Sequence, residues 1–324
     1  DTDNPTTDAR TVRATINDGD GGTSASADVT VNVAGVNDAP AASGAGATLA
    51  YTEGSSATVI DSSLTLSDVD SNNLTGATVT ISGNFQSGGE DVLAFTAASG
   101  SGITGSFNNS TGVLTLSGTT TKALYEQTLE SVTYQNTSDD PSTSARTITW
   151  QVNDGSSANN LSSAVTSTVS VAAVNDVPTI ANLGSDSFTF TEGAAATLID
   201  QSSNAALADV DSSNFNGGNL TVTIASGEDA NEDVLSLSTS GTVALASTNA
   251  NANVSVGGTV VGTLGNAISA GNDLVVSLNS AATAANVQTL VQAITYQNTD
   301  TDNPTTDART VRATINDGDG GTSA

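Results

Sequence analysis

The sequence predicts an all-β fold, built from tandem β-sandwich domains that stack end to end and each carry one short helix. Apolar and polar residues alternate in Thr- and Val-rich stretches such as RTITWQV (146–152) and LTVTI (220–224), as in half-buried strands. Clusters of Gly, Asn, Asp and Ser separate such stretches at intervals of about 8–12 residues, which is typical of a β-sandwich. The same short motifs also occur twice along the chain in the same order.

These repeated motifs define the domains. VNDAP at 36–40 corresponds to VNDVP at 174–178, and a common series follows each copy. The paired motifs are YTEG and FTEG (51–54, 190–193), SDVDS and ADVDS (67–71, 208–212), EDVL (90–93, 232–235), TYQNT (133–137, 295–299), ART (145–147, 308–310) and NDG (153–155, 316–318). We predict a first-type domain over 36–175 and a second-type domain over 176–324 that lacks its last strand. Residues 1–35 are then the C-terminal part of another second-type domain.

The two domain types differ between EDVL and TYQNT, where the second has 20 more residues. This difference predicts an inserted hairpin within 240–280. Just before TYQNT, each domain has a helical pattern of about three turns, at 121–132 and at 281–294. In the alternating pattern RTITWQV, Trp150 falls on the side that faces inward, so it is expected in the core.

The first 25 residues recur without change as residues 300–324. Such a match indicates one period of a longer array with a short overlap. In the first copy, RTVRATI (10–16) and ADVTVNV (27–33) are not preceded by the other strands of their domain. These two strands would be an unsupported hairpin, which is marginally stable alone, so we expect an isolated chain to be disordered before about residue 35 unless another chain or the preceding part of a longer array supplies the missing strands.

Composition excludes several classes of function. The net charge is −28, with six basic and 34 acidic residues, so nucleic acid and anionic membrane surfaces are excluded as partners. The chain has no Cys or His, which removes disulfides, thiolate chemistry and the commonest general base. No apolar run reaches the length of a membrane-spanning helix, so no membrane insertion is expected in this segment. The excess of carboxylates favours a divalent cation, and oxygen ligands suit calcium.

Strand direction predicts where the acidic motifs meet. If consecutive strands alternate in direction, DVD and NDG lie at one end of a sandwich, and TEG and the exit to VND lie at the other. Stacked domains then face each other with acids on both sides of VNDxP. The first predicted junction comprises Asp1, Asp3, Asn37, Asp38, Asp68, Asp70 and Asp154. The second comprises Glu53, Asp139, Asp140, Asn175, Asp176, Asp209, Asp211 and Asp317.

Calcium is the cofactor predicted at these junctions, because so many carboxylates in one cluster would otherwise repel one another. The alternative for any single residue is an ordinary turn, since Asp, Asn and NDG are common turn formers. The EDVL acids Glu90, Asp91, Glu232 and Asp233 lie outside the junctions and are interpreted as solvated loop residues.

The motif order, with TEG, DVD, NDG and VNDxP each following a strand, resembles the cadherin-like tandem repeats of giant bacterial surface adhesins of the RTX or VCBS type. The resemblance spans essentially the whole chain. It implies sandwiches of seven or more strands, calcium between domains and an extracellular location on the bacterial cell surface. The sequence departs from the cadherin pattern at SDDP (138–141) and DTDNP (300–304), and Gly35 and Ala173 stand where the linker has a leading Asp. These departures imply fewer or weaker calcium sites.

The function predicted from this resemblance is a calcium-stiffened extender that serves cell-surface adhesion or biofilm formation, with neighbouring repeats of the same chain as partners. One alternative is an extracellular filament or sheath of identical chains, paired through exposed edge strands. A polysaccharide-binding module is disfavoured, because aromatic residues are only 3% of the chain. An enzyme is disfavoured by the absence of His and of any nucleophile motif.

Overall fold

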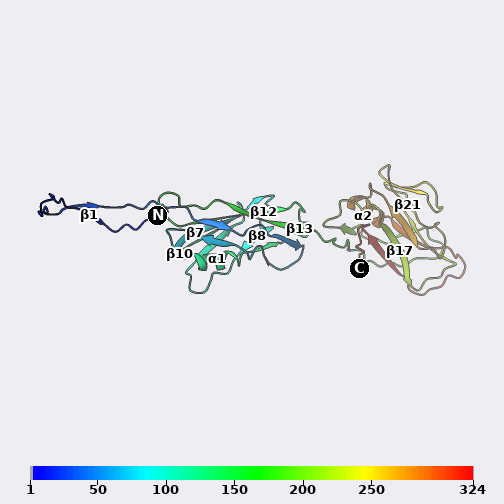
Figure 1. The fold of residues 1–324 in the computed structure, drawn as a ribbon. Helices are drawn as coiled ribbons and strands as arrows, with labels where there is room; N and C mark the ends of the chain where they lie inside the picture. Colours follow the sequence, from blue (N-terminus) through cyan, green and yellow to red (C-terminus); the bar gives the residue numbers. More distant parts are fainter. Residues whose placement is uncertain (1–2, 324) are drawn as a thin grey trace. The chain divides into compact units, whose positions relative to one another are not determined.

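The computed structural model describes residues 3–323, and the chain divides into two compact units, Asp1–Val174 and Asn175–Ala324. Figure 1 shows both units as β-structures with short helices. The described residues contain two helices, α1 (Lys122–Leu129) and α2 (Ala284–Gln292), one in each unit. Neither is long and apolar enough to cross a membrane. The predicted all-β class with one short helix per domain is confirmed.

Two sheets enclose the core of the first unit. The strands of this unit are β1 (Arg10–Ala14), β2 (Ala27–Val31), β3 (Ala41–Ser43), β4 (Thr48–Thr52), β5 (Thr58–Val59), β6 (Thr65–Ser67), β7 (Asn73–Gly83), β8 (Asp91–Ala94), β9 (Thr104–Asn108), β10 (Val113–Thr121), β11 (Thr133–Asn136), β12 (Arg146–Asn153) and β13 (Val165–Ala172). A six-stranded sheet has the order β4-β13-β12-β7-β10-β9, and a three-stranded sheet has the order β5-β11-β8. Residues from both sheets form one apolar cluster.

Strand β13 lies between β12 and β4, and these two strands run in opposite directions. It is antiparallel to β12, with Val169 opposite Arg146, and parallel to β4, with Val169 opposite Leu49 and Val171 opposite Tyr51. Val169 and Val171 are buried, as alternation along a strand with one face on the core requires. Strand β13 therefore joins β4 to the rest of the six-stranded sheet and covers the core at this side of the sandwich.

Trp150 lies in the core of the first unit, as expected, with 1% of its surface exposed. Its indole Nε1 donates a hydrogen bond to Ser167 Oγ at 3.0 Å, and that hydroxyl donates to Asp61 Oδ2 at 2.7 Å. Asp61 also accepts from Ser63 Oγ at 2.6 Å and from the Ala47 amide at 3.1 Å. This buried carboxylate thus joins β13 to the chain before β4.

We expect Asp61 to make the stability of the first unit depend on acid pH. Burial alone would raise the pKa of Asp61, but the hydrogen bonds from Ser63, Ser167 and Ala47 outweigh it and lower that pKa from 3.8 to about 2. The stabilisation is therefore complete above pH 3.8 and is lost as pH falls from there toward 2. The shift corresponds to about 2 kcal/mol.

The measurement is urea unfolding followed by Trp150 fluorescence between pH 2 and 6, because this is the only tryptophan of the chain. Asp61→Asn should flatten the pH dependence over that range. The exposed Asp139→Asn, studied in chelator, is the control and should retain it. A pH profile of Asp61→Asn that matches the wild type would refute the assignment.

The second unit has a similar plan with additional strands. Its strands are β14 (Thr179–Ala181), β15 (Thr197–Leu198), β16 (Ala206–Ala208), β17 (Asn219–Ser226), β18 (Asp233–Leu237), β19 (Val243–Leu245), β20 (Asn253–Val256), β21 (Thr259–Leu264), β22 (Leu274–Leu278), β23 (Ile294–Asn298) and β24 (Thr310–Asn316). The sheet β19-β20-β21-β22-β17-β24 packs with β15-β23-β18 around one core. Strand β22 pairs with β17 as β10 pairs with β7, so β19 and β20 add to the common plan.

The second sandwich has no counterpart of β13 and β4 beside its large sheet among the described residues. Its large sheet ends at β24, whereas the corresponding strand β12 has β13 on its outer side. Residues 186–191, which align with 47–52 around β4, form no strand. Within residues 3–323, the outer edge of β24 pairs only at its end, where Asn316 forms a bridge with Thr322 and the Ile315 carbonyl oxygen accepts from the Ser323 amide at 2.8 Å.

The hairpin of β1 and β2 packs against no core. All five residues of each strand are exposed, including Val12 and Val29 at 58% and 62%. Arg13 pairs with Asp28 across the hairpin at 2.9 Å. Residues 10–14 and 27–31 thus pair as a hairpin without a supporting core, where the sequence predicted disorder before about residue 35.

A buried ion pair in each unit overturns the interpretation of EDVL as a solvated loop. Asp91 and Asp233 are 0% and 1% exposed. Asp91 lies 3.1 Å from Arg146 Nε and accepts hydrogen bonds from Tyr134 Oη at 2.5 Å and Asn136 Nδ2 at 2.8 Å. The prediction was wrong because each carboxylate, although it follows a polar loop, is neutralised by an arginine distant in the sequence.

The second unit repeats this network with the same residue types. Asp233 lies 3.0 Å from Arg309 Nε and accepts from Tyr296 Oη at 2.6 Å and Asn298 Nδ2 at 3.1 Å. Burial raises the pKa of Asp233, but the hydrogen bond from Arg309 contributes to a net lowering. Burial and Asp233 together raise the pKa of Tyr296 to about 12. EDVL, TYQNT and ART are therefore three parts of one structural network.

Candidate metal centres

Three loops at one end of the first sandwich bring together VND, DVD and NDG. VND precedes β3, DVD follows β6, and NDG begins at the end of β12. Asn37 Nδ2 donates to Asp154 Oδ2 at 2.9 Å, and the Asp38 amide donates to Asp70 Oδ2 at 3.0 Å. Asp154 is buried, with 8% of its surface exposed. We call Asn37, Asp38, Asp68, Asp70 and Asp154 the first acidic cluster.

Hydrogen bonds between side chains and backbone groups hold the DVD loop of this cluster in place. Asp68 Oδ1 accepts from the amides of Ser71 at 2.9 Å and Asp70 at 3.2 Å. Lys122 Nζ, at the start of α1, donates to the carbonyl oxygens of Asp68 at 2.7 Å and Ser71 at 2.5 Å. Lys122 therefore binds the loop carbonyls, while Asp68 Oδ2 is buried without a hydrogen-bond partner among the described residues.

The two carboxyl groups of DVD influence each other's protonation. Burial raises the pKa of Asp68, and the neighbouring Asp70 raises it further. The pKa of Asp70 is lowered, first by the hydrogen bond from the Asp38 amide and then by Asp68. Two like charges this close favour protonation of one of them or the approach of a cation.

The second unit contains a matching group, Asn175, Asp176, Asp209, Asp211 and Asp317, which we call the second acidic cluster. Asn175 Nδ2 donates to Asp317 Oδ2 at 2.8 Å, and the Asp176 amide donates to Asp211 Oδ2 at 3.0 Å. Asp317 is fully buried, and hydrogen bonds from Asn175 and nearby amides lower its pKa although burial opposes this. Burial, and then Asp211, raise the pKa of Asp209.

Four carboxylate oxygens of the clusters are buried without a hydrogen-bond partner in the part of the chain that the structure describes. They are Asp68 Oδ2, Asp176 Oδ2, Asp209 Oδ2 and Asp211 Oδ1. Folded proteins seldom leave such groups unsatisfied, because the desolvation cost is not recovered. These oxygens are hard donors of the kind that calcium takes in sets of 6–8. The residues therefore fit a bound divalent cation.

The side chains supply part of such a coordination shell. Within residues 3–323, no three His, Cys, Asp or Glu side chains already stand in metal-binding geometry. Each cluster, however, also contains the amide oxygen of its Asn and several loop carbonyl oxygens. Calcium accepts these ligands together with carboxylates and water.

The remaining predicted ligands of the second junction belong to the first unit. Glu53 follows β4, and its Oε2 accepts a hydrogen bond from the Val174 amide at 2.8 Å, just beyond β13. Asp139 and Asp140 are exposed in the loop after β11. Since β13 is antiparallel to β12, this end of the sandwich is opposite to Asp154. It stays a prediction that Glu53, Asp139 and Asp140 converge with the second acidic cluster.

The N-terminal ligands predicted for the first junction are only partly described. Asp1 lies outside the described residues, and Asp3 is exposed. Asn4, which follows Asp3, donates its Nδ2 to the Val69 carbonyl oxygen in the DVD loop at 3.0 Å. Asn4 thus connects the segment that contains Asp3 to the DVD loop.

Comparison with known proteins gives a short sequence match. No protein-family model matches the chain. Over 92 residues, or 28% of this chain, the sequence is 40% identical to halomucin of Haloquadratum walsbyi (strain DSM 16790 / HBSQ001), and the match covers 1% of halomucin.

Among solved structures, the chain is similar to protocadherin gammaB7 EC3-6, with 16% identity, a TM-score of 0.28, and coverage of 97% of this chain and 58% of that one. For Drosophila N-cadherin EC1-4 the identity is 11%, the TM-score 0.23 and the coverage 97% and 56%. The chain spans less than two thirds of the length of these structures. The fold assignment rests on the sheets described above.

Proposed function

We propose that this chain is a structural segment of an extracellular adhesive protein, in which calcium bound at the acidic clusters stiffens the connection between consecutive sandwich domains. The observation that carries the proposal is that the first carboxylate of DVD has a buried oxygen without a partner in both units, Asp68 Oδ2 and Asp209 Oδ2, and that the second cluster has two more, on Asp176 and Asp211. An ordinary turn satisfies its Asp oxygens with its own amides, whereas these oxygens are left for another ligand.

The chain's own residues would hold the linking segment against the sandwich. Asn37 and Asp38 lie in the segment that enters the first-type domain, and their hydrogen bonds reach Asp154 and Asp70. A bound cation supplies positive charge among these carboxylates and removes their mutual repulsion. Pro40 then fixes the backbone just after the cluster. The segment would thereby lose its freedom relative to the domain that follows it.

The predicted outer ligands complete the proposal. In the second junction Glu53, Asp139 and Asp140 would contribute from the preceding domain, and in the first Asp1 and Asp3 would do so. Bacterial cell-surface location, biofilm formation and membership of the RTX- or VCBS-type adhesins follow from the motif resemblance and belong to the same proposal. This role is not enzymatic.

Removal of calcium should change the shape of the chain more than its secondary structure. With calcium, small-angle scattering should give a longer maximum dimension than with chelator, because bound cations restrict the junctions. Far-ultraviolet circular dichroism should change little, since each unit has its own apolar core. Identical scattering profiles in both conditions would contradict the stiffening role.

A further inference from the structure

Lys122 is the only lysine of the chain, and it lies where its helix alone would not favour a positive charge. It is the first residue of α1, directly after the N-cap Thr121. The amide groups at the start of a helix carry partial positive charge, so a cation is disfavoured there. The first turn of α1 contains no acidic residue that would offset this effect. Groups outside the helix must therefore accommodate the charge of Lys122.

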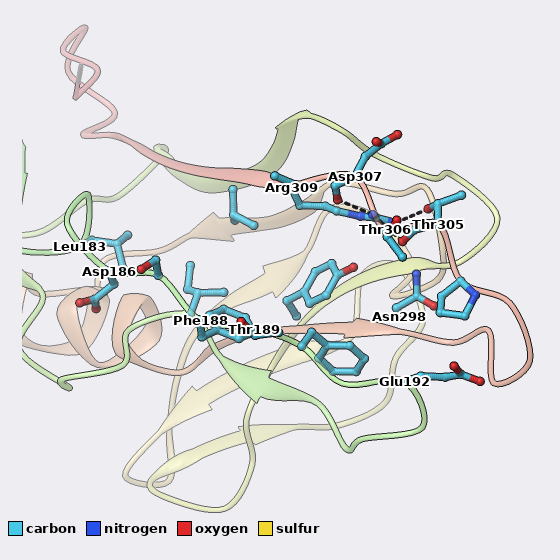
Figure 2. A pocket seen from close by; sticks show the side chains of 17 residues that line it. Leu183, Asp186, Phe188, Thr189, Glu192, Asn298, Thr305, Thr306, Asp307 and Arg309 are labelled. Carbon is cyan, nitrogen blue, oxygen red and sulfur yellow. Dashed lines mark hydrogen bonds between the residues drawn. The ribbon is translucent and has the colours of Figure 1, made fainter.

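Lys122 also differs from the two arginines inside the sandwiches. Arg146 and Arg309 each pair with a buried carboxylate of their own unit. Figure 2 shows the additional hydrogen bonds that Arg309 donates to the carbonyl oxygens of Thr305 and Asp307. Lys122, in contrast, has no carboxylate at ion-pair distance within residues 3–323. Its half-buried ammonium group interacts with the DVD loop instead.

The groups that Lys122 binds are oxygens of the kind that calcium takes. Its Nζ donates to the carbonyl oxygens of Asp68 at 2.7 Å and Ser71 at 2.5 Å, on either side of Asp70 in the sequence. Calcium accepts backbone carbonyl oxygens together with carboxylates. The ammonium group thus occupies two oxygen donors of the DVD loop and brings one positive charge to the first acidic cluster.

Ala284 stands at the position of Lys122 in the second unit. Thr283 caps α2 as Thr121 caps α1. Glu126 and Gln288, four residues after these two positions, each accept a hydrogen bond from the amide of the leucine two residues before DVD, at 2.8 and 3.1 Å. The two helices therefore have equivalent places beside their DVD loops, and only the first one brings a cation.

The oxygens of the second acidic cluster are correspondingly free. The carbonyl oxygens of Asp209 and Ser212, which correspond to those that Lys122 binds, accept no hydrogen bond from the residues that the structure describes. Three of the four buried carboxylate oxygens without a partner belong to this cluster, and Asp68 Oδ2 is the one in the first. The second cluster thus has more unoccupied donors and no positive side chain.

We propose that the Lys122 ammonium group takes part of the place of a bound cation at the first acidic cluster, so that this cluster binds calcium more weakly than the second. The inference rests on the proposed calcium function and adds that the two domain types are not equivalent. A positive charge held at the DVD loop opposes the approach of another cation, and the ammonium group withholds two carbonyl oxygens. The two clusters then fill at different calcium concentrations.

The test measures calcium binding to one cluster at a time, by calorimetric titration of the full chain. A chain with Asp209→Asn and Asp211→Asn reports on the first cluster. In this chain, Lys122→Ala should raise the calcium affinity on the order of tenfold, because it removes the competing charge and frees two carbonyl oxygens. Lys122→Arg keeps the charge and should not raise the affinity. Circular dichroism checks that each chain is folded.

The reciprocal variant adds a lysine to the second cluster. In a chain with Asp68→Asn and Asp70→Asn, Ala284→Lys should lower the calcium affinity on the order of tenfold. Ala285→Lys is the matched control, since it adds the same charge at the exposed neighbouring residue, which faces another side of the helix. There the charge is screened by solvent, and the affinity should change by less than about twofold.

The outcomes separate this inference from the calcium proposal itself. If calcium binds but Lys122→Ala has the affinity of its parent chain, or Ala284→Lys has that of Ala285→Lys, the role of Lys122 is overturned and the calcium proposal stands. If calcium binds to none of the chains, both are overturned.

Discussion

Asp91→Asn should destabilise the first unit by about 3–5 kcal/mol, because it leaves the Arg146 guanidinium buried without a counter-charge. Both side chains of this pair are fully buried. Tyr134 and Asn136 donate to the same carboxylate, so the substitution also weakens their hydrogen bonds. We expect this to be among the largest effects of any single substitution in the chain.

The effect is measured by urea unfolding at neutral pH with Trp150 fluorescence, which reports on the first unit. Glu90→Gln is the matched control, since it removes one negative charge at the neighbouring, half-buried position and should change stability by less than about 0.5 kcal/mol. If Asp91→Asn behaves like Glu90→Gln, the ion pair does not support the fold. The equivalent Asp233→Asn should have a smaller effect, because Arg309 is 10% exposed and part of its charge can be solvated.

The gathering of VND, DVD and NDG could be predicted from the sequence, because strand alternation decides at which end of a sandwich each loop lies. The hydrogen bonds of Asn37 to Asp154 and of Asp38 to Asp70 are the contacts expected from that reasoning. The buried carboxylate oxygens without a hydrogen-bond partner could not be predicted. They depend on which amides each carboxylate faces, and this is set by loop conformation at the scale of single bonds.

The burial of Asp91 was missed because the sequence around it, SGGEDVL, has the composition of a loop. Its partner Arg146 lies 55 residues away, so no local pattern connects them. A signal was nevertheless present. In a chain with only six basic residues, an arginine that recurs in both copies of ART, together with EDVL and TYQN, indicates a required acidic partner.

The second large effect concerns calcium binding by the second acidic cluster. Asp209 and Asp211 have one unpartnered buried oxygen each, so both are expected to bind the same cation. Asp209→Asn or Asp211→Asn should each weaken calcium binding at this cluster by at least about tenfold, which corresponds to about 1.4 kcal/mol. The double substitution should cost less than the sum of the two, because residues that share a ligand are not independent.

Calorimetric titration of calcium into the wild-type chain and a variant with both Asp70→Asn and Asp211→Asn tests the central claim most directly. Glu90→Gln, outside both clusters, is the control. The account predicts saturable binding to the wild type and to Glu90→Gln, and loss of that binding in the double variant, with each chain folded as judged by circular dichroism. Absence of calcium binding by the wild type, or unchanged affinity in the double variant, would contradict it.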